Sequence, residues 1–327
     1  MIRRLMHVFA LSEKGAKDFV KAVIWCFVCN ISLMLPVGVV IGTIQYLMNA
    51  LETGGDPMDQ IWLYTGLGVV TVVVLFVLHY FQYASLYLAT YKESASRRVS
   101  LAETLRKLPL SFFGNRDLSD LTSTMIADCS SLDQMFSHYI PQLFASIFST
   151  LFIGICMLCI EWRMALAVLW VLPVAVLLTA GSKKLQDAFG TKNILAKRAV
   201  ADNVQECLEN VRDIKACNRQ EIYLKELDEK LKTAENCAIQ SELATGVFVC
   251  SAQAFLRIGL ATTVLVGVDL LVKGELSFLF FVGFLFAAAR LYDPLGLVLQ
   301  NLAATFNAKL QINRMRAILE QPVQTGS

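Results

Sequence analysis

Six long apolar stretches constrain the fold of this chain more than any other feature of its sequence. A helix needs about 20 apolar residues to cross the hydrocarbon of a bilayer. Hydrophobic residues make up 56% of the chain and charged residues 17%, whereas soluble domains have about 45–50% and about 25%. The sequence therefore predicts an all-α membrane protein with six transmembrane helices, over residues 19–48, 61–90, 137–160, 163–182, 243–272 and 277–303.

Basic residues are concentrated on one predicted side of the membrane. Of the 29 Lys and Arg residues, 25 lie in the N-terminal segment, the loops 92–136 and 183–242, and the segment after residue 303. Only Arg163 and Lys273 fall on the opposite side. Because cytoplasmic loops carry the excess of Lys and Arg, both termini are predicted to be cytoplasmic. The expected location is the plasma membrane, with the bacterial inner membrane as the favoured interpretation.

The two internal loops, 92–136 and 183–242, are long, and their composition is helical. They have 45 and 60 residues, contain few Gly and Pro, and repeat apolar residues at helical spacing, as in Leu224, Leu227 and Leu231. We expect the membrane helices to continue into the cytosol, turn and return. About 20 extra helical residues would project roughly 30 Å, and that reach indicates contact with a partner below the membrane.

Each loop contains a short segment suited to such a contact. In residues 108–121, Pro109 can begin a helix and Gly114 with Asn115 can end it. Phe112 and Phe113 then form an apolar knob that fits a partner's groove or packs into the chain's own core, and both interpretations stay open. The second loop contains a short amphipathic helix, with charges on its outer face, at residues 206–219.

Several segments resemble the membrane domains of ABC exporters, in order and at the right separations. Leu105-Arg106-Lys107-Leu108-Pro109-Leu110-Ser111-Phe112-Phe113 resembles their first intracellular loop, and residues 204–216 resemble their second. Residues 287–295 and 314–320 resemble their sixth helix and the lead-in to an ATPase domain. Gly114, Ser119 and Thr124 depart from the usual family pattern.

The resemblance implies a domain layout and a set of contacts. Residues 1–18 would be a cytoplasmic N-terminal segment with an elbow helix, 19–320 the six-helix domain and 321–327 the start of a linker. Two half-transporters, identical or different, would form a twelve-helix body on two ATPase domains. The first coupling helix would use Leu110, Ser111, Phe112, Phe113, Asn115 and Asp117, and the second Glu209, Asn210, Arg212, Asp213 and Lys215.

No phosphate-binding Gly-x-x-x-x-Gly-Lys-Ser/Thr motif occurs in the sequence. We therefore expect no catalytic residue and no cofactor in this chain, and the resemblance places ATP and Mg²⁺ on an ATPase domain elsewhere. That domain is expected to follow this chain in a longer protein, and a separate ATPase subunit is the alternative. The bilayer and a small organic substrate are the other expected partners, and nucleic acid is not.

Polar residues within the spans are candidates for a substrate cavity. Arg257 and Arg290 fall near the bilayer midplane, where charges are costly and often functional. Asp293 could neutralise Arg290 locally, whereas Arg257 has no acid within reach on its own helix. We expect these arginines to line a wet cavity for an amphipathic, anionic organic cargo. The residues that could join them, each with a helix–helix hydrogen bond as the alternative role, are Asn30, His79 and Gln300.

Other functions and ligands remain open at this stage. In the same fold, the alternative is uptake of iron–siderophore complexes. From other classes, the alternatives are an ion-coupled carrier, which would favour acidic relays and inverted repeats, and a membrane scaffold. Two Cys-x-x-Cys pairs, Cys26/Cys29 and Cys156/Cys159, could suggest a soft metal site. Their predicted positions on opposite sides of the membrane favour buried, reduced thiols and no metal.

Overall fold

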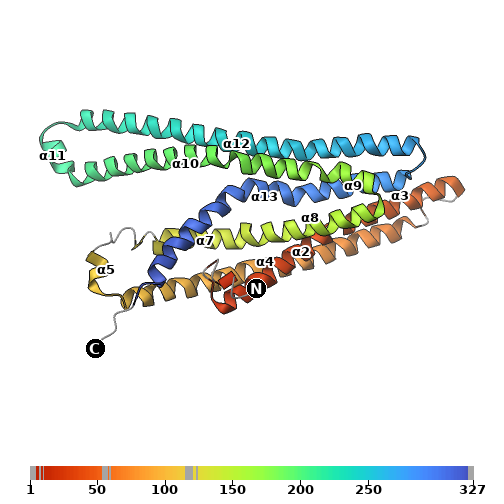
Figure 1. Ribbon diagram of the computed structural model, residues 1–327, viewed down its shortest axis with the longest axis horizontal. Helices are drawn as coiled ribbons and strands as arrows, with labels where there is room; N and C mark the ends of the chain where they lie inside the picture. The colour runs from red at the N-terminus through yellow and green to blue at the C-terminus, as the bar shows by residue number, and fades with distance from the viewer. Residues whose placement is uncertain are drawn as a thin grey trace. The chain divides into compact units, whose positions relative to one another are not determined.

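The computed structural model describes residues 5, 6, 9, 11–53, 58, 60–114, 121, 122 and 124–322, excluding the side chains of 183, 187, 297 and 299–310. These residues form helices and contain no strand (Figure 1). Six helical segments are long and apolar enough to cross a membrane: 13–53, 61–106, 124–160, 162–209, 220–272 and 278–296. The predicted all-α fold with six spans is therefore confirmed.

The chain divides into two compact units, and each is described by itself. The first unit comprises residues 1–169 and 259–327. Its N-terminal helices are α2 (Glu13–Ser32), α3 (Leu35–Thr53), α4 (Ile61–Arg106) and α5 (Leu110–Gly114). A further run contains two π-helical turns: η1 (Thr124–Asp128), α7 (Cys129–Gln134), η2 (Met135–Tyr139), α8 (Ile140–Ile160) and α9 (Trp162–Leu169). The last helix of this unit is α13 (Phe278–Leu319).

The second unit is a long helical hairpin, residues 170–258. It contains α10 (Val171–Glu209), the short α11 (Val211–Ala216) and the greater part of α12 (Gln220–Val272). Asn203 of α10 donates a hydrogen bond to Glu226 of α12 at 3.4 Å. Glu226 also pairs with Lys230 one turn along its own helix, at 2.7 Å. Polar side chains thus connect the two arms of this hairpin.

The longest helices extend well beyond the length needed to cross a bilayer. With 46 residues, α4 spans about 70 Å at 1.5 Å per residue, and the hydrocarbon core is about 30 Å thick. The helix runs without a break from its apolar stretch through residue 90 to Arg106. The first internal loop therefore begins as a continuation of the membrane helix, as its helical spacing predicts.

A hydrophobic core holds the first unit together beyond the apolar stretches. It includes Phe19 of α2, Leu101 of α4, Leu132 of α7, Phe136 of η2 and Met315 of α13. Phe136 contacts Phe19 edge-on, with their ring centroids 6.1 Å apart. These side chains come from five elements, so the core fixes how the helix ends emerge from the spans.

Tight packing at a glycine gives a test of the membrane part of this unit. A Cβ added at Gly267 of α12 would overlap the ring of Phe281 on α13 and lie 3.1 Å from Met164 of α9. Small residues allow such close approach between membrane helices. We expect Gly267→Leu to destabilise the domain by about 1–3 kcal/mol through overpacking, measured as a lower melting temperature in detergent.

The matched control is Gly66→Leu on α4, because nothing lies within 4 Å of a Cβ added at Gly66. This control should melt like the unaltered protein. Equal melting of the two variants would contradict the packing around Gly267.

Candidate functional site

The first turn beyond the membrane places an apolar tip on its surface. Leu108 is buried and precedes α5, whose Phe112 packs against the hydrophobic core of the first unit. Leu110 is 86% exposed and Phe113 37% exposed. The Phe113 ring lies edge-on to Phe112, with centroids 5.5 Å apart. Phe112 therefore packs into the chain's own core, whereas Leu110 and Phe113 form an exposed tip, hereafter the α5 tip. Contact of this tip with a partner's groove stays a prediction.

Three other residues of this turn were predicted to belong to the first coupling helix. Ser111 is exposed on α5. Asn115 and Asp117 lie outside the described residues, so their contribution to the first coupling segment stays a prediction.

The second turn is compact and charged. Asn210 separates α10 from α11, and its side-chain amide donates to the Glu206 carbonyl at 3.0 Å. At the other end, Asn218 adopts a left-handed conformation with φ of 53°, and the Arg219 amide closes the helix onto the Ile214 carbonyl at 3.0 Å. This pattern is a common C-terminal helix stop.

The side chains of this turn separate into one anchor and a charged surface. Ile214 is the buried residue of α11. All five residues predicted for the second coupling segment are exposed, and they lie together on and beside α11: Glu209, Asn210, Arg212, Asp213 and Lys215. Within the predicted short helix at residues 206–219, α10 extends to Glu209 and the separate α11 has only six residues. The role of these residues as a coupling segment stays a prediction.

The residues predicted to line a substrate cavity lie on different helices and make different contacts. Asn30 of α2 is buried; its amide donates to Ser149 of α8 at 3.2 Å, and its oxygen accepts from Gln142 at 3.1 Å. His79 is exposed on α4, and its Nδ1 lies 2.8 Å from the carbonyl of Leu75 on the same helix. Asn30 therefore connects two helices, which is the alternative role considered for it.

The remaining residues predicted for the substrate cavity are Arg257, Arg290 and Gln300. Arg290 is exposed on α13 and pairs with Asp293 at 3.5 Å, as the one-turn spacing suggested. Arg257 is exposed on α12 within the second unit, and no ion pair to it is found among the described residues of that unit. The side chain of Gln300 lies outside the described part.

A charged cluster that the sequence did not single out lies just beyond the apolar stretch of α4. Asp133 of α7 is 3.0 Å from Arg98 and 3.8 Å from Arg97, and the Ser94 hydroxyl donates to it at 2.5 Å. Arg97 is buried against the face of Phe136. The cluster joins α4 to α7.

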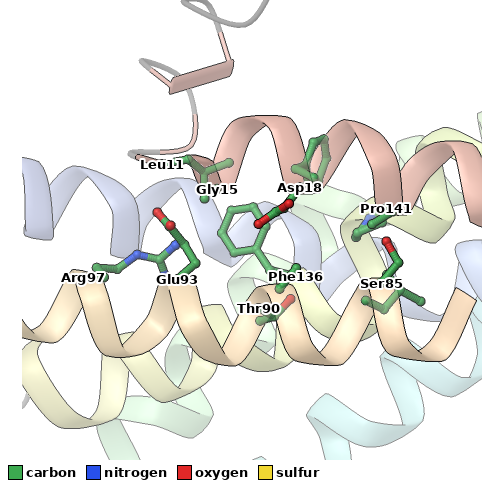
Figure 2. A pocket seen from close by; sticks show the side chains of 13 residues that line it. Leu11, Gly15, Asp18, Ser85, Thr90, Glu93, Arg97, Phe136 and Pro141 are labelled. Atoms are coloured by element: carbon green, nitrogen blue, oxygen red, sulfur yellow. The ribbon is translucent and has the colours of Figure 1, made fainter. Parts of the chain in front are cut away.

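Glu93, one turn before Arg97 on α4, binds the start of α2. The backbone amide and hydroxyl of Ser12 both donate to Glu93, at 2.7 and 2.6 Å, and Ser12 also caps α2 by accepting from Gly15. Figure 2 shows the Glu93 carboxylate turned from α4 toward Leu11 and Gly15. The cavity beside them measures about 20 Å³, which is room for about one water molecule. This region is therefore a structural junction and too small for cargo.

The cysteines carry free thiols and form no metal site among the described residues. All nine thiols are free, with Cys26 and Cys29 buried and Cys156 and Cys159 exposed. Cys26 accepts a hydrogen bond from Gln82 at 3.3 Å. The described part of the chain contains no group of three or more His, Cys, Asp or Glu residues placed to hold a metal ion.

Six spans whose extensions end in two small exposed turns define a multi-pass membrane domain of the transporter class. The profile of the ABC transporter transmembrane region matches residues 22–295. The chain belongs to this family, and the predicted family membership is confirmed.

Similarity to individual proteins agrees with the family. The chain is 24% identical to the putative ABC transporter ATP-binding protein exp8 of Streptococcus pneumoniae, over 85% of this chain and 46% of that protein. It is 20% identical to the serine protease/ABC transporter B family protein tagA of Dictyostelium discoideum, over 84% and 15%. It is 25% identical to the alpha-factor-transporting ATPase of Candida albicans, over 53% and 14%. The chain thus spans less than half the length of these relatives.

The contacts of Asn30 predict a structural effect. We expect Asn30→Ala to lower the stability of the domain by about 0.5–2 kcal/mol, because the substitution removes hydrogen bonds between α2 and α8 within the membrane. The measurement is thermal melting in detergent. His79→Ala is the control, since the His79 ring bonds only its own helix carbonyl in the described structure; Asn30→Ala melting no lower than this control would contradict the structural role.

Proposed function

We propose that this chain is the membrane-spanning permease domain of an ATP-driven exporter of amphipathic organic compounds. Two copies, or this chain and a related half-transporter, would form the working pair. ATP and Mg²⁺ would bind to ATPase domains outside this chain, and the complete transporter would be an ATP-hydrolysing translocase. Alternating access would arise from rigid-body movement of the helices.

The observation that carries this proposal is the pair of exposed turns at the ends of long helices. The α5 tip exposes two large apolar side chains, and soluble surfaces enriched in such anchors are typical of protein interfaces. In contrast, α11 presents charged residues. An apolar anchor on one turn and charges on the other suit contacts with two different surfaces of an ATPase domain pair.

An apolar pocket in the first unit supports an amphipathic cargo. It measures about 330 Å³, within the size range of small-molecule sites. It lies among α3, α8 and α13, and its walls include Ile41, Met157, Phe280, Gly283 and Phe284. One relative is named for transporting alpha-factor, which is consistent with organic cargo.

The α5 tip gives a direct test of coupling. In the complete transporter, we expect the double variant Leu110→Ser, Phe113→Ser to reduce substrate-stimulated ATP hydrolysis at least tenfold, because loss of a central apolar anchor costs about 2 kcal/mol or more. The measurement is ATPase activity in liposomes with and without a transported compound.

Ser111→Ala on the same turn is the matched control and should keep stimulation near the unaltered level. Retained stimulation in the double variant, with normal melting and expression, would remove the α5 tip from the coupling interface.

Orientation is tested at the second turn. We propose that both termini and both turns face the cytoplasm, because the basic segments lie on that side. Cys217 is exposed directly after α11. In a variant that keeps Cys217 as its sole cysteine, a membrane-impermeant maleimide should label inside-out vesicles and leave intact cells unlabelled. A single-cysteine variant at Cys156 is predicted to give the reverse pattern, and labelling of Cys217 in intact cells would invert the topology.

A further inference from the structure

One face of α4 bears a row of tyrosines that ends at an arginine. Tyr80, Tyr83, Tyr87 and Tyr91 are followed by Ser94 and Arg98. Their spacing of three, four, four, three and four residues places all six on one side of an α-helix. Tyr83 stacks on Tyr87 with ring centroids 4.1 Å apart, and Tyr87 lies 6.4 Å from Tyr91. We call these four tyrosines the tyrosine stripe.

The stripe is too long for an aromatic belt at the membrane surface. Tyrosines that anchor a span lie at the headgroup level, in a layer roughly 5–8 Å thick on each side of the hydrocarbon. From Tyr80 to Tyr91 the stripe covers about 16 Å along the helix axis. Tyr80, Tyr83 and Tyr91 are all more than 60% exposed. Hydroxylated rings displayed over this length on a helix of the spanning region suit contact with an amphipathic molecule better than contact with lipid tails.

The stripe leads into a polar pocket of about 370 Å³ between α4 and the α7–η2 segment. His138 of η2 closes one side, where its ring lies edge-on to Tyr87 and its Nδ1 is 3.0 Å from the Tyr87 hydroxyl. The volume falls within the range of small-molecule sites. Side chains that can form hydrogen bonds line the pocket, and the hydroxyl of one of them, Ser137, already donates to the Asp133 carbonyl at 2.8 Å. The full set is Tyr91, Arg98, Ser130, Gln134, Ser137 and His138.

The charges lining this pocket are balanced, and an exposed guanidinium in it can bind an anion. Among the described residues that line the pocket, Asp133 is the one carboxylate, and it is shared by Arg98, Arg97 and the Ser94 hydroxyl. Glu93 lines the small cavity on the far side of Arg97, where it accepts hydrogen bonds from Ser12. The Arg98 side chain remains 44% exposed, so part of its guanidinium can still bind a ligand.

We propose that the tyrosine stripe and this pocket form a binding track for an amphipathic organic anion. The anionic group binds Arg98 and the donors around it, and the apolar body lies on Tyr83, Tyr87 and Tyr91. The inference rests on the proposed transport function and names its substrate class. Charge-assisted hydrogen bonds to a guanidinium supply selectivity for the anion, and ring faces accept varied apolar bodies.

Direct binding tests the track without using ATP. The complete transporter in phosphatidylcholine nanodiscs is titrated, without nucleotide, with dansylaminoundecanoic acid and with its uncharged methyl ester, and dansyl fluorescence reports binding. The acid should bind more tightly than the ester. Arg98→Gln should weaken binding of the acid tenfold or more and leave the ester unchanged.

Two further variants separate the charge effect from folding. Lys92→Gln removes one positive charge on another face of α4, about 9 Å along the helix axis from Arg98, and it should bind the acid normally. Tyr83→Leu, on the part of the stripe outside the polar pocket, should weaken the acid and the ester alike, and its exposed position keeps the fold intact if Arg98→Gln melts early. Equal binding of acid and ester by the unaltered protein, or unchanged binding of the acid after Arg98→Gln in a folded protein, would overturn the proposal.

The source of the anion is distinguished by competition. If added phosphatidylglycerol displaces the bound acid, the track binds an anionic lipid. If the acid stays bound, the track binds a free organic anion. Both outcomes support the anionic class. Failure of the transport function would appear as absent substrate-stimulated ATPase activity while acid-over-ester binding persists, so the two proposals fail separately.

Discussion

The rest of this structure depends on one constraint, the need to pair every backbone polar group within hydrocarbon. An unpaired amide or carbonyl there costs several kcal/mol, so a span can break only where another group takes over. At the break between α9 and α10, the Val168 carbonyl accepts from the Tyr292 hydroxyl at 2.7 Å. The Ala167 carbonyl nearby accepts from Thr262 at 2.9 Å. The hydroxyls of neighbouring helices thus pair two backbone carbonyls at the end of α9.

The same constraint makes the remaining helices long and stiff, and the stiffness extends outside the membrane. Because α4 has no break between its apolar stretch and Arg106, a force on α5 reaches the span directly. At that distance from the bilayer the chain exposes Leu110, a residue type that usually lies inside proteins. Rigid extension and an exposed apolar end together suit a domain that is moved by another protein.

The sequence predicts properties that depend on one segment alone, and it does not predict contacts between distant segments. The six spans were predictable because apolar length is a property of each segment alone, and the pair Arg290 and Asp293 because the partners are one turn apart. The cluster of Arg97, Arg98 and Asp133 was not predictable, since Asp133 lies 35 residues from Arg98 and meets the two arginines only when α4 packs against α7. The position of Asn30 along its span likewise predicted its depth in the membrane, but it did not predict which helix Asn30 would face. Its hydrogen bonds to Ser149 and Gln142 show that this helix is α8.

The charged pairs of this domain are of two kinds, those within one helix and those that join different helices. Exposed pairs within one helix, such as Lys232 with Asp228, contribute little to stability, because both side chains stay solvated. The pairs that join different helices are more buried: Arg97 with Asp133, and Arg314 of α13 with Asp128 of η1 at 3.3 Å. Removing one partner of such a pair leaves an uncompensated charge, which is costly. These pairs and the hydrophobic core around Phe136 tie α4, α7 and α13 together beyond the apolar stretch of α4.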